Sequence, residues 1–325
     1  MTDPILDPLN DEQREAVTHK EGPLLILAGA GSGKTRVITH RMAHLVRDHD
    51  VPPYRILGVT FTNKAADEMK ERARELVGRQ TLQPELNTFH SFGVNMIREE
   101  IEALEREQNF SIYDSADQRS LVKEIMGELG IDTDRLEPKD VQNRISRAKD
   151  QLLLPDDYAT ENEDVDERVL SIYRNYEDRL REYNAYDFGD LLVYPVRLLR
   201  RNDSVRERWT QGSQAFEYLM IDEFQDTNAA QYALAEILSS AHGNLAVVGD
   251  DDQSIYSWRG ADVTNILNFE QDFPNTRTVR LEQNYRSTEP ILSAAHQIIS
   301  NNAERKEKRL WTDRQDGHEP QVYDA

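Results

Sequence analysis

The chain has 325 residues, with 39 basic against 60 acidic side chains and a formal net charge of −21. This length supports two or three domains, and the acidity argues against binding nucleic acid through an extended basic surface. The sequence has no cysteine, which excludes disulfides and thiolate metal sites. It has no leader-like start and no apolar run near the ~18 residues of a membrane span, so we expect a soluble cytoplasmic protein without membrane contacts.

The excess of acidic residues has a physical consequence of its own. Repulsion among like charges is screened at high ionic strength, so a strongly acidic surface suits cells that accumulate salt. The composition therefore suggests a halophilic source, which we treat as a hypothesis. A local basic or aromatic groove remains compatible with the overall charge.

Short apolar segments bounded by turn residues predict the buried strands of a parallel sheet. Helical patterns separate the first three segments, and another helical pattern follows the fourth. This alternation is typical of a doubly wound α/β sheet. The predicted strands are residues 24–28, 56–61, 85–89, 217–222 and 245–250.

The strand signal disappears between residues 93 and 200 and gives way to helical patterns. Apolar residues recur at four-residue spacing from Leu121 to Leu129, and a second stripe runs from Val169 to Tyr183. Ser115 and Gln118 predict a capping box at the start of the first helix. We therefore expect an all-helical segment inserted into the sheet domain.

The stretch AGAGSGKT follows the first strand directly and has the composition of a phosphate-binding loop. Small residues allow backbone N–H groups to surround a phosphate, and the next helix directs its N-terminus at the same anion. Lys34 is expected to reach the β and γ phosphates, and Thr35 to hold Mg²⁺. The alternative is a glycine-rich turn without a ligand. The loop comprises Ala28 (where the strict pattern has glycine), Gly29, Ala30, Gly31, Ser32, Gly33, Lys34 and Thr35.

Two carboxylates at the end of the fourth strand supply the second half of a nucleotide site. Asp222 closes the strand and is expected to orient Mg²⁺ through water. Glu223 follows it, where a carboxylate can accept a proton from attacking water. The alternative is that both are ordinary acids at a helix start, favoured by the helix dipole.

Gln13, in LNDEQREAV, has two interpretations that the local sequence leaves open. It can complete a capping box with Asn10 at the start of a helix. It can also pair through its amide with the N6 and N7 edge of adenine.

Seven segments occur in an order that carries a specific resemblance. Together they resemble the successive motifs of superfamily 1 DNA helicases of the UvrD/Rep/PcrA type, from residue 9 to about residue 287. The resemblance implies a RecA-like P-loop NTPase domain, 1A, over residues 1–92 and 201–282. It also implies a helical insertion, 1B, over residues 93–200 and the start of a truncated domain 2A over residues 283–325. The segments are LNDEQREAV, AGAGSGKT, TFTNKAADEMKER, TFHSFG, IDEFQDTN, VVGDDDQSIYSWRGAD and LEQNYRS.

The resemblance assigns roles residue by residue. It implies that Gln13 reads adenine, that Tyr285 stacks on the base, and that Arg36 and Arg72 are further nucleotide-site arginines. The catalytic group would comprise Lys34, Glu223, the γ-phosphate sensor Gln253, and Arg286 at the γ-phosphate. The single-strand path would be lined by Phe61, Asn63, Thr88, His90, Tyr256, Trp258 and Arg259.

The segment after the fifth strand suggests how the two sites communicate. Gln253 can hydrogen-bond toward the γ-phosphate, while Tyr256, Trp258 and Arg259 lie three to six residues further on. Stacking of a base on an aromatic side chain contributes about 1–3 kcal/mol and tolerates any base. One loop could thus make the affinity for DNA depend on whether the γ-phosphate is present. The alternative for Trp258 is a buried core aromatic, and the alternative for His90 is a structural histidine.

The implied function is an ATP- and Mg²⁺-dependent helicase or translocase on single-stranded DNA and single-strand/duplex junctions. The family suggests 3′-to-5′ movement and a role in repair or replication. The fifth and sixth helicase motifs are absent, so we expect a fragment with little DNA-stimulated hydrolysis and no unwinding. Alternatives are an ATP-gated single-strand-binding module and a P-loop phosphotransferase. The segment YDFGDLL departs from the family, which usually has an acid at the position of Gly189.

Overall fold

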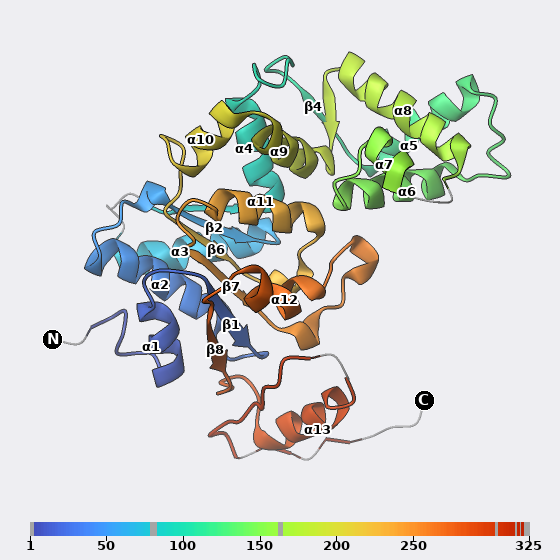
Figure 1. Cartoon of the computed structure of the whole chain (residues 1–325). Helices are drawn as coiled ribbons and strands as arrows, with labels where there is room; N and C mark the ends of the chain where they lie inside the picture. Colours follow the sequence, from blue (N-terminus) through green and yellow to red (C-terminus); the bar gives the residue numbers. More distant parts are fainter. Residues whose placement is uncertain are drawn as a thin grey trace. The chain divides into compact units, whose positions relative to one another are not determined.

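A computed structural model describes residues 3–78, 83–161, 165–302, 305–315, 317–318 and 320–321; the side chain of Arg259 lies outside this description. The chain divides into two compact units (Figure 1). Unit 1 comprises Met1–Thr88, Trp209–Thr227 and Leu238–Ala325. Unit 2 comprises Phe89–Arg208 and Asn228–Ile237. The chain therefore leaves unit 1 after Thr88, returns to it at Trp209, and leaves it once more for Asn228–Ile237.

Unit 1 is built on a six-stranded parallel sheet in the order β3-β2-β6-β7-β1-β8. All five predicted strands are present, and the predicted α/β class is confirmed. The sixth strand was not predicted, because its burial alternates and Arg277 and Arg280 are exposed, so it lacks a continuous apolar run. The strands are β1 (Leu24–Ala28), β2 (Ile56–Thr60), β3 (Glu85–Thr88), β6 (Tyr218–Ile221), β7 (Leu245–Gly249) and β8 (Arg277–Leu281).

Both faces of most strands are buried, which explains why these strands are apolar throughout. One set of alternating strand residues, including Ile26, Met220 and Val248, packs in the same core cluster as residues of α1, α2 and α3. The opposite set, including Leu27 and Val247, is also buried. The helices of this unit are α1 (Asp11–Thr18), α2 (Lys34–Asp48), α3 (Asn63–Val77), α12 (Thr264–Asp272) and α13 (Glu289–Ile299).

The strand order brings three loops to one edge of the sheet. β6, β7 and β1 are consecutive neighbours, and all three run in the same direction. The segments after Ile221, Gly249 and Ala28 therefore leave the sheet side by side. Ligands bind at this carboxyl edge in open α/β sheets.

Unit 2 is mainly helical, as the sequence predicted, and the structure adds a short parallel strand pair, β4 (Ser111–Tyr113) with β5 (Ala185–Asp187). Both apolar stripes lie on helices and contribute to one buried cluster, except for their last residues, Leu129 and Tyr183, which follow the helix ends and are exposed. No described helix has the length and apolar character needed to cross a membrane. The remaining helices are α4 (Phe89–Glu99), α5 (Ser115–Glu128), α6 (Pro138–Asp150), α7 (Pro155–Glu161), α8 (Glu167–Glu182), α9 (Asp190–Arg201), α10 (Asp203–Thr210) and α11 (Ala229–Ser239), the last two crossing unit boundaries.

The predicted capping box at Ser115 and Gln118 was wrong by one residue. Asp114 is the N-cap of α5, and its side chain accepts hydrogen bonds from the backbone of Ala116 and Asp117. The Asp117 side chain accepts in return from the Asp114 backbone N–H. Aspartate is as good an N-cap as serine, so the sequence offered two adjacent solutions.

A buried lysine lies among three carboxylates in unit 2. Lys149 Nζ lies 2.6 Å from Glu177, 2.8 Å from Asp187 and 2.6 Å from Asp190. Burial alone would lower the pKa of Lys149, but these carboxylates raise it well above its ordinary value. A Cβ at Gly189 would lie 2.8 Å from Lys149 Cβ and Cδ. A side chain at position 189 would therefore crowd the buried lysine as it is placed here.

Replacing Lys149 tests how much this cluster contributes to the free energy of unfolding. We expect Lys149→Met to lower the free energy of unfolding by about 3–5 kcal/mol, because three carboxylates would lose their buried counter-ion. Lys139→Met, at an exposed position of the same helix, should change it little. Urea denaturation monitored by circular dichroism measures both, and equal stability of the two variants would contradict the assignment.

The Asp150 carboxyl predicts a pH-dependent contribution to stability. Burial raises its pKa to about 7, against a hydrogen bond from Asn228. The folded chain therefore holds a proton that the unfolded chain releases at lower pH, so stability falls as pH rises from 4 to 7. We expect Asp150→Asn to stabilise unit 2 by up to about 4 kcal/mol at pH 8 and to have little effect at pH 4. Denaturant titrations at both pH values check this, with the exposed Asp178→Asn expected to show no such difference.

Candidate nucleotide site and its flanking loops

The phosphate-binding loop adopts the strand–turn–helix arrangement that its sequence predicts. It starts at Ala28, the last residue of β1, and α2 begins at Lys34. Gly31 and Gly33 have φ values of 72° and 93°, which favour glycine. The Ser32 hydroxyl donates to the Gly29 carbonyl at 2.8 Å, which closes the turn. The helix N-terminus and the loop amides are thereby available to an anion.

Two contacts join this loop to the carboxylates that follow β6. Lys34 Nζ lies 2.8 Å from Glu223 Oε2. The Thr35 hydroxyl donates to Asp222 Oδ2 at 3.1 Å. Neither acid caps a following helix: Asp222 Oδ1 accepts from the next backbone N–H, and Glu223 makes no side-chain cap. Glu223 occupies the N-cap position of a short 3-10 helix, Phe224–Asp226, without a side-chain cap, and the helix-start interpretation of these acids remains an alternative.

Electrostatics and backbone conformation both mark these carboxylates as unusual. The pKa of Asp222 is raised to about 6, first by burial and then by the neighbouring Glu223, while Lys34 and the Thr35 hydroxyl oppose the shift. Glu223 has φ 53° and ψ 44°, a left-handed conformation that is costly for a residue with a side chain. Such shifts and strain concentrate at functional sites.

The donor set fits a magnesium–nucleotide complex. Within the described residues, Lys34 Nζ is buried and has no hydrogen-bond acceptor besides its ion pair with Glu223. Hydroxyl and carboxylate oxygens, as in Thr35 and Asp222, are the ligands or outer-sphere partners that Mg²⁺ prefers. The residues could therefore hold a phosphate through the lysine and loop amides, and the metal through the threonine and aspartate.

The Gln13 side chain satisfies the first of its two interpretations. It forms the capping box with Asn10 at the start of α1. Its Nε2 also donates to the Ser32 carbonyl at 2.9 Å, and it is buried against Gly33. The amide is therefore attached to the phosphate-binding loop, and its role as an adenine reader stays a prediction.

Gln225 connects the two acidic loops and was not predicted from the sequence. Its Nε2 donates to Glu223 Oε2 at 3.0 Å, and its Oε1 accepts from the Asp250 backbone N–H at 3.0 Å. Asp250 Oδ2 in turn accepts a hydrogen bond from the Gln253 amide. A continuous path of polar contacts thus runs from Lys34 through Glu223 and Gln225 to the predicted γ-phosphate sensor.

Asn284 attaches the LEQNYRS segment to the phosphate-binding loop and was also not predicted. Its amide donates to the Ala30 carbonyl, and its Oδ1 accepts from the backbone N–H of Arg286 at 2.9 Å. The Tyr285 backbone N–H donates to Gly31 O at 3.0 Å. Tyr285 is 43% exposed, so its ring is accessible beside the loop. Its base-stacking role and the γ-phosphate role of Arg286 stay predictions.

The two further arginines line a cavity of about 300 Å³ between α2 and α3. Arg36 and Arg72 are brought together there with Thr39, His40, Glu75 and Leu76. Arg36 lies two residues after Lys34, at the start of the same helix. Their proximity is consistent with a nucleotide site but does not test it.

Two aromatic residues of the predicted DNA path lie on the loop after Gln253. Tyr256 is 37% exposed and Trp258 is 63% exposed. Their ring centroids are 6.4 Å apart. The core alternative for Trp258 was therefore wrong, because most of its side chain is exposed. Arg259 has no described side chain, so its prediction lies outside the described structure.

The other residues predicted for the DNA path are divided between the units. Phe61 is partly buried, Asn63 is the exposed first residue of α3, and Thr88 is buried at the end of β3 in unit 1. His90 belongs to unit 2, where its ring contacts Phe188 at 6.0 Å. Burial lowers the pKa of His90, so the ring is neutral at pH 7. A DNA role for these residues stays a prediction.

Comparison with known proteins identifies the family. The sequence matches the UvrD/REP helicase N-terminal domain over residues 9–274 and the UvrD-like helicase C-terminal domain over residues 279–325. It is 47% identical over 322 residues to the proteins named ATP-dependent DNA helicase PcrA from Staphylococcus aureus and Staphylococcus epidermidis. Each alignment covers 99% of this chain but only 44% of the relative. The chain belongs to the UvrD/REP helicase family.

Proposed function

We propose that this chain supplies the ATP-binding part of an ATP-dependent DNA helicase that moves on single-stranded DNA. The observation that carries the proposal is the path of contacts from Lys34 and Glu223 through Gln225 and Asp250 to Gln253. It joins a phosphate-binding loop to a loop that presents two exposed aromatic rings. A phosphotransferase would not need this second element.

The residues divide the chemistry among them. The loop amides and Lys34 bind and orient the phosphates, and Glu223 accepts a proton from the attacking water. Bound near Thr35 and Asp222, Mg²⁺ would neutralise charge that develops on the phosphates. When nucleotide enters, Lys34 exchanges its carboxylate partner for phosphate, which frees Glu223 for its role as a base.

The finer assignments belong to the proposal as well. Movement from 3′ to 5′, a substrate with a single-strand/duplex junction, and a role in repair or replication are suggested by the family. The division into 1A (residues 1–92 and 201–282), 1B (residues 93–200) and the start of 2A (residues 283–325) is also part of the proposal. The halophilic source rests on the net charge of −21 alone.

A second candidate is an ATP-gated single-strand-binding module without motor activity. The same exposed rings and the same path of contacts would serve it. ATP hydrolysis with and without oligo-dT, at low and molar KCl, separates the two. Stimulation by DNA supports the motor, binding without turnover supports the module, and absence of both ATP and DNA binding would overturn the proposed function.

Replacing the catalytic carboxylate separates binding from hydrolysis. We expect Glu223→Gln to reduce hydrolysis by roughly 10²- to 10⁴-fold, because the base is lost. Affinity for ATP should be kept or rise, because Lys34 no longer has an anionic partner, whereas Lys34→Ala should weaken it. Phosphate release and titration with a fluorescent ATP analogue measure the two effects. Glu217→Gln, at an exposed position before β6, is the control, and loss of nucleotide binding in Glu223→Gln would contradict the assignment.

The exposed tryptophan is expected to hold a DNA base. Trp258→Ala should weaken oligo-dT affinity about 5- to 150-fold, the equivalent of one lost stacking contact. Affinity for nucleotide should remain unchanged. Fluorescence anisotropy of labelled oligo-dT measures this, with Tyr54→Ala as a control because Tyr54 is also an exposed aromatic of unit 1. Equal DNA affinity in both variants would remove Trp258 from the path.

A further inference from the structure

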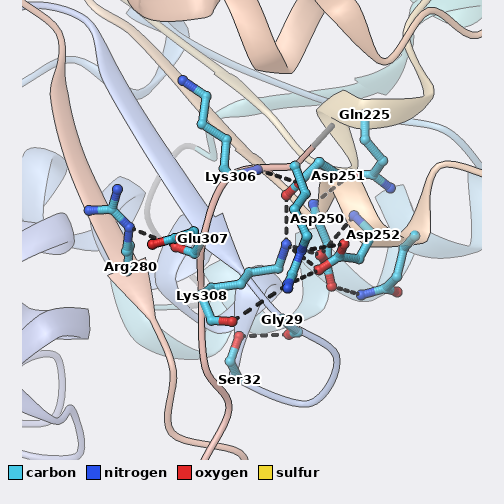
Figure 2. Close-up of polar contacts among 12 residues, drawn as sticks. Gly29, Ser32, Gln225, Asp250, Asp251, Asp252, Arg280, Lys306, Glu307 and Lys308 are labelled. Carbon is cyan, nitrogen blue, oxygen red and sulfur yellow. Dashed lines mark hydrogen bonds and ion pairs between the residues drawn. The ribbon is translucent and has the colours of Figure 1, made fainter. Parts of the chain in front are cut away.

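Lys308 occupies the centre of a carboxylate cluster of which the proposed function uses only Asp250. The cluster comprises Asp250, Asp251 and Asp252, and one carboxylate oxygen from each lies within 4.8 Å of the other two. Lys308 Nζ lies 2.8 Å from the first, 2.6 Å from the second and 2.8 Å from the third (Figure 2). The lysine side chain is 3% exposed. An ammonium from a distant segment thus fills the position that a cation would take.

The same segment makes two further contacts with the cluster. Arg305 donates to both oxygens of Asp252, at 3.0 and 2.6 Å. The backbone N–H of Lys306 donates to Asp251 Oδ2 at 2.8 Å. Burial alone would lower the pKa of Lys308, but the aspartates raise it above its ordinary value. The lysine therefore remains charged and neutralises acids that lie beside a site for an anion.

Asp250 connects this cluster to the nucleotide sensor. One of its oxygens pairs with Lys308, and the other accepts a hydrogen bond from the Gln253 amide. Its backbone N–H donates to Gln225. The orientation of the Asp250 carboxylate is thus fixed on one side by the lysine, and Gln253 depends on that orientation.

The segment is also held against the phosphate-binding loop. A Cβ at Gly29 would lie 2.4 Å from Leu310 Cδ2, so the leucine side chain lies directly over the start of the loop. The Trp311 carbonyl accepts from the Asn284 backbone N–H at 2.7 Å. Residues 305–311 therefore contact both the phosphate-binding loop and the aspartate turn.

We propose that Lys308 is a positioning residue: its ammonium holds the aspartate turn so that Gln253 faces the phosphate and transmits nucleotide state to the loop of Trp258. The proposal rests on the proposed function, because it needs a chain that binds both ATP and single-stranded DNA. Without Lys308, the three carboxylates repel one another and the turn opens. Gln253 then loses its fixed partner, while the phosphate-binding loop and the exposed rings remain.

The test is the thermodynamic coupling between nucleotide and DNA in the whole chain. Oligo-dT affinity is measured with and without a non-hydrolysable ATP analogue, and the ratio of the two dissociation constants is the coupling factor. We expect wild type to show coupling of about fivefold or more. Lys308→Met should bring the factor to within about twofold of unity, with each ligand still bound. Arg309→Met, the exposed next residue, should retain wild-type coupling.

A charge-balanced variant separates positioning from folding. Lys308→Met combined with Asp251→Asn removes one cation and one anion. The melting temperature of this double variant should therefore be closer to that of wild type than the melting temperature of Lys308→Met alone. We expect it still to lack coupling, because Asp250 has lost its fixed partner. Wild-type coupling in either variant would overturn the role of Lys308. Absence of coupling in wild type with both ligands bound would count against the proposal, whereas failure of wild type to bind either ligand would count against the proposed function.

Discussion

The ion pair between Lys34 and Glu223 depends on the parallel order of the sheet. The lysine follows β1 and the glutamate follows β6, and β7 lies between these two strands. A shared strand direction is what brings all three loop ends to one edge. The same edge receives Asp250 after β7, so Gln225, on the loop that carries Glu223, can also contact the loop after β7. Reversing one strand would separate the groups of the site.

Buried charge is the second constraint, and the chain meets it in the same way in both units. Lys149 is surrounded by three carboxylates in unit 2, and Lys308 by three in unit 1. In each case one ammonium group forms ion pairs with three carboxylates that would otherwise repel one another. A chain with this excess of acidic residues needs such internal counter-ions wherever carboxylates leave water.

The sequence predicted those features that are local or repeated along the chain. Strands buried on both faces were found because they are continuous apolar runs, and the phosphate-binding loop because its glycines and lysine are consecutive. β8 was not found, because its exposed arginines interrupt the run. Gln225, Asn284 and Lys308 were not found, because their partners lie across the fold: Lys308 lies more than 50 residues from the aspartates it neutralises, and no local pattern records that pairing.

The left-handed backbone of Glu223 has a consequence for how this position can vary. Glycine adopts φ 53° without strain, and asparagine adopts it more readily than glutamate does. Neither supplies an ionised carboxylate beside Lys34. Backbone strain alone would favour a small residue here, whereas the base role proposed for Glu223 requires a carboxylate. A substitution that removes the backbone strain at this position would therefore be expected to raise stability and to remove the proposed base.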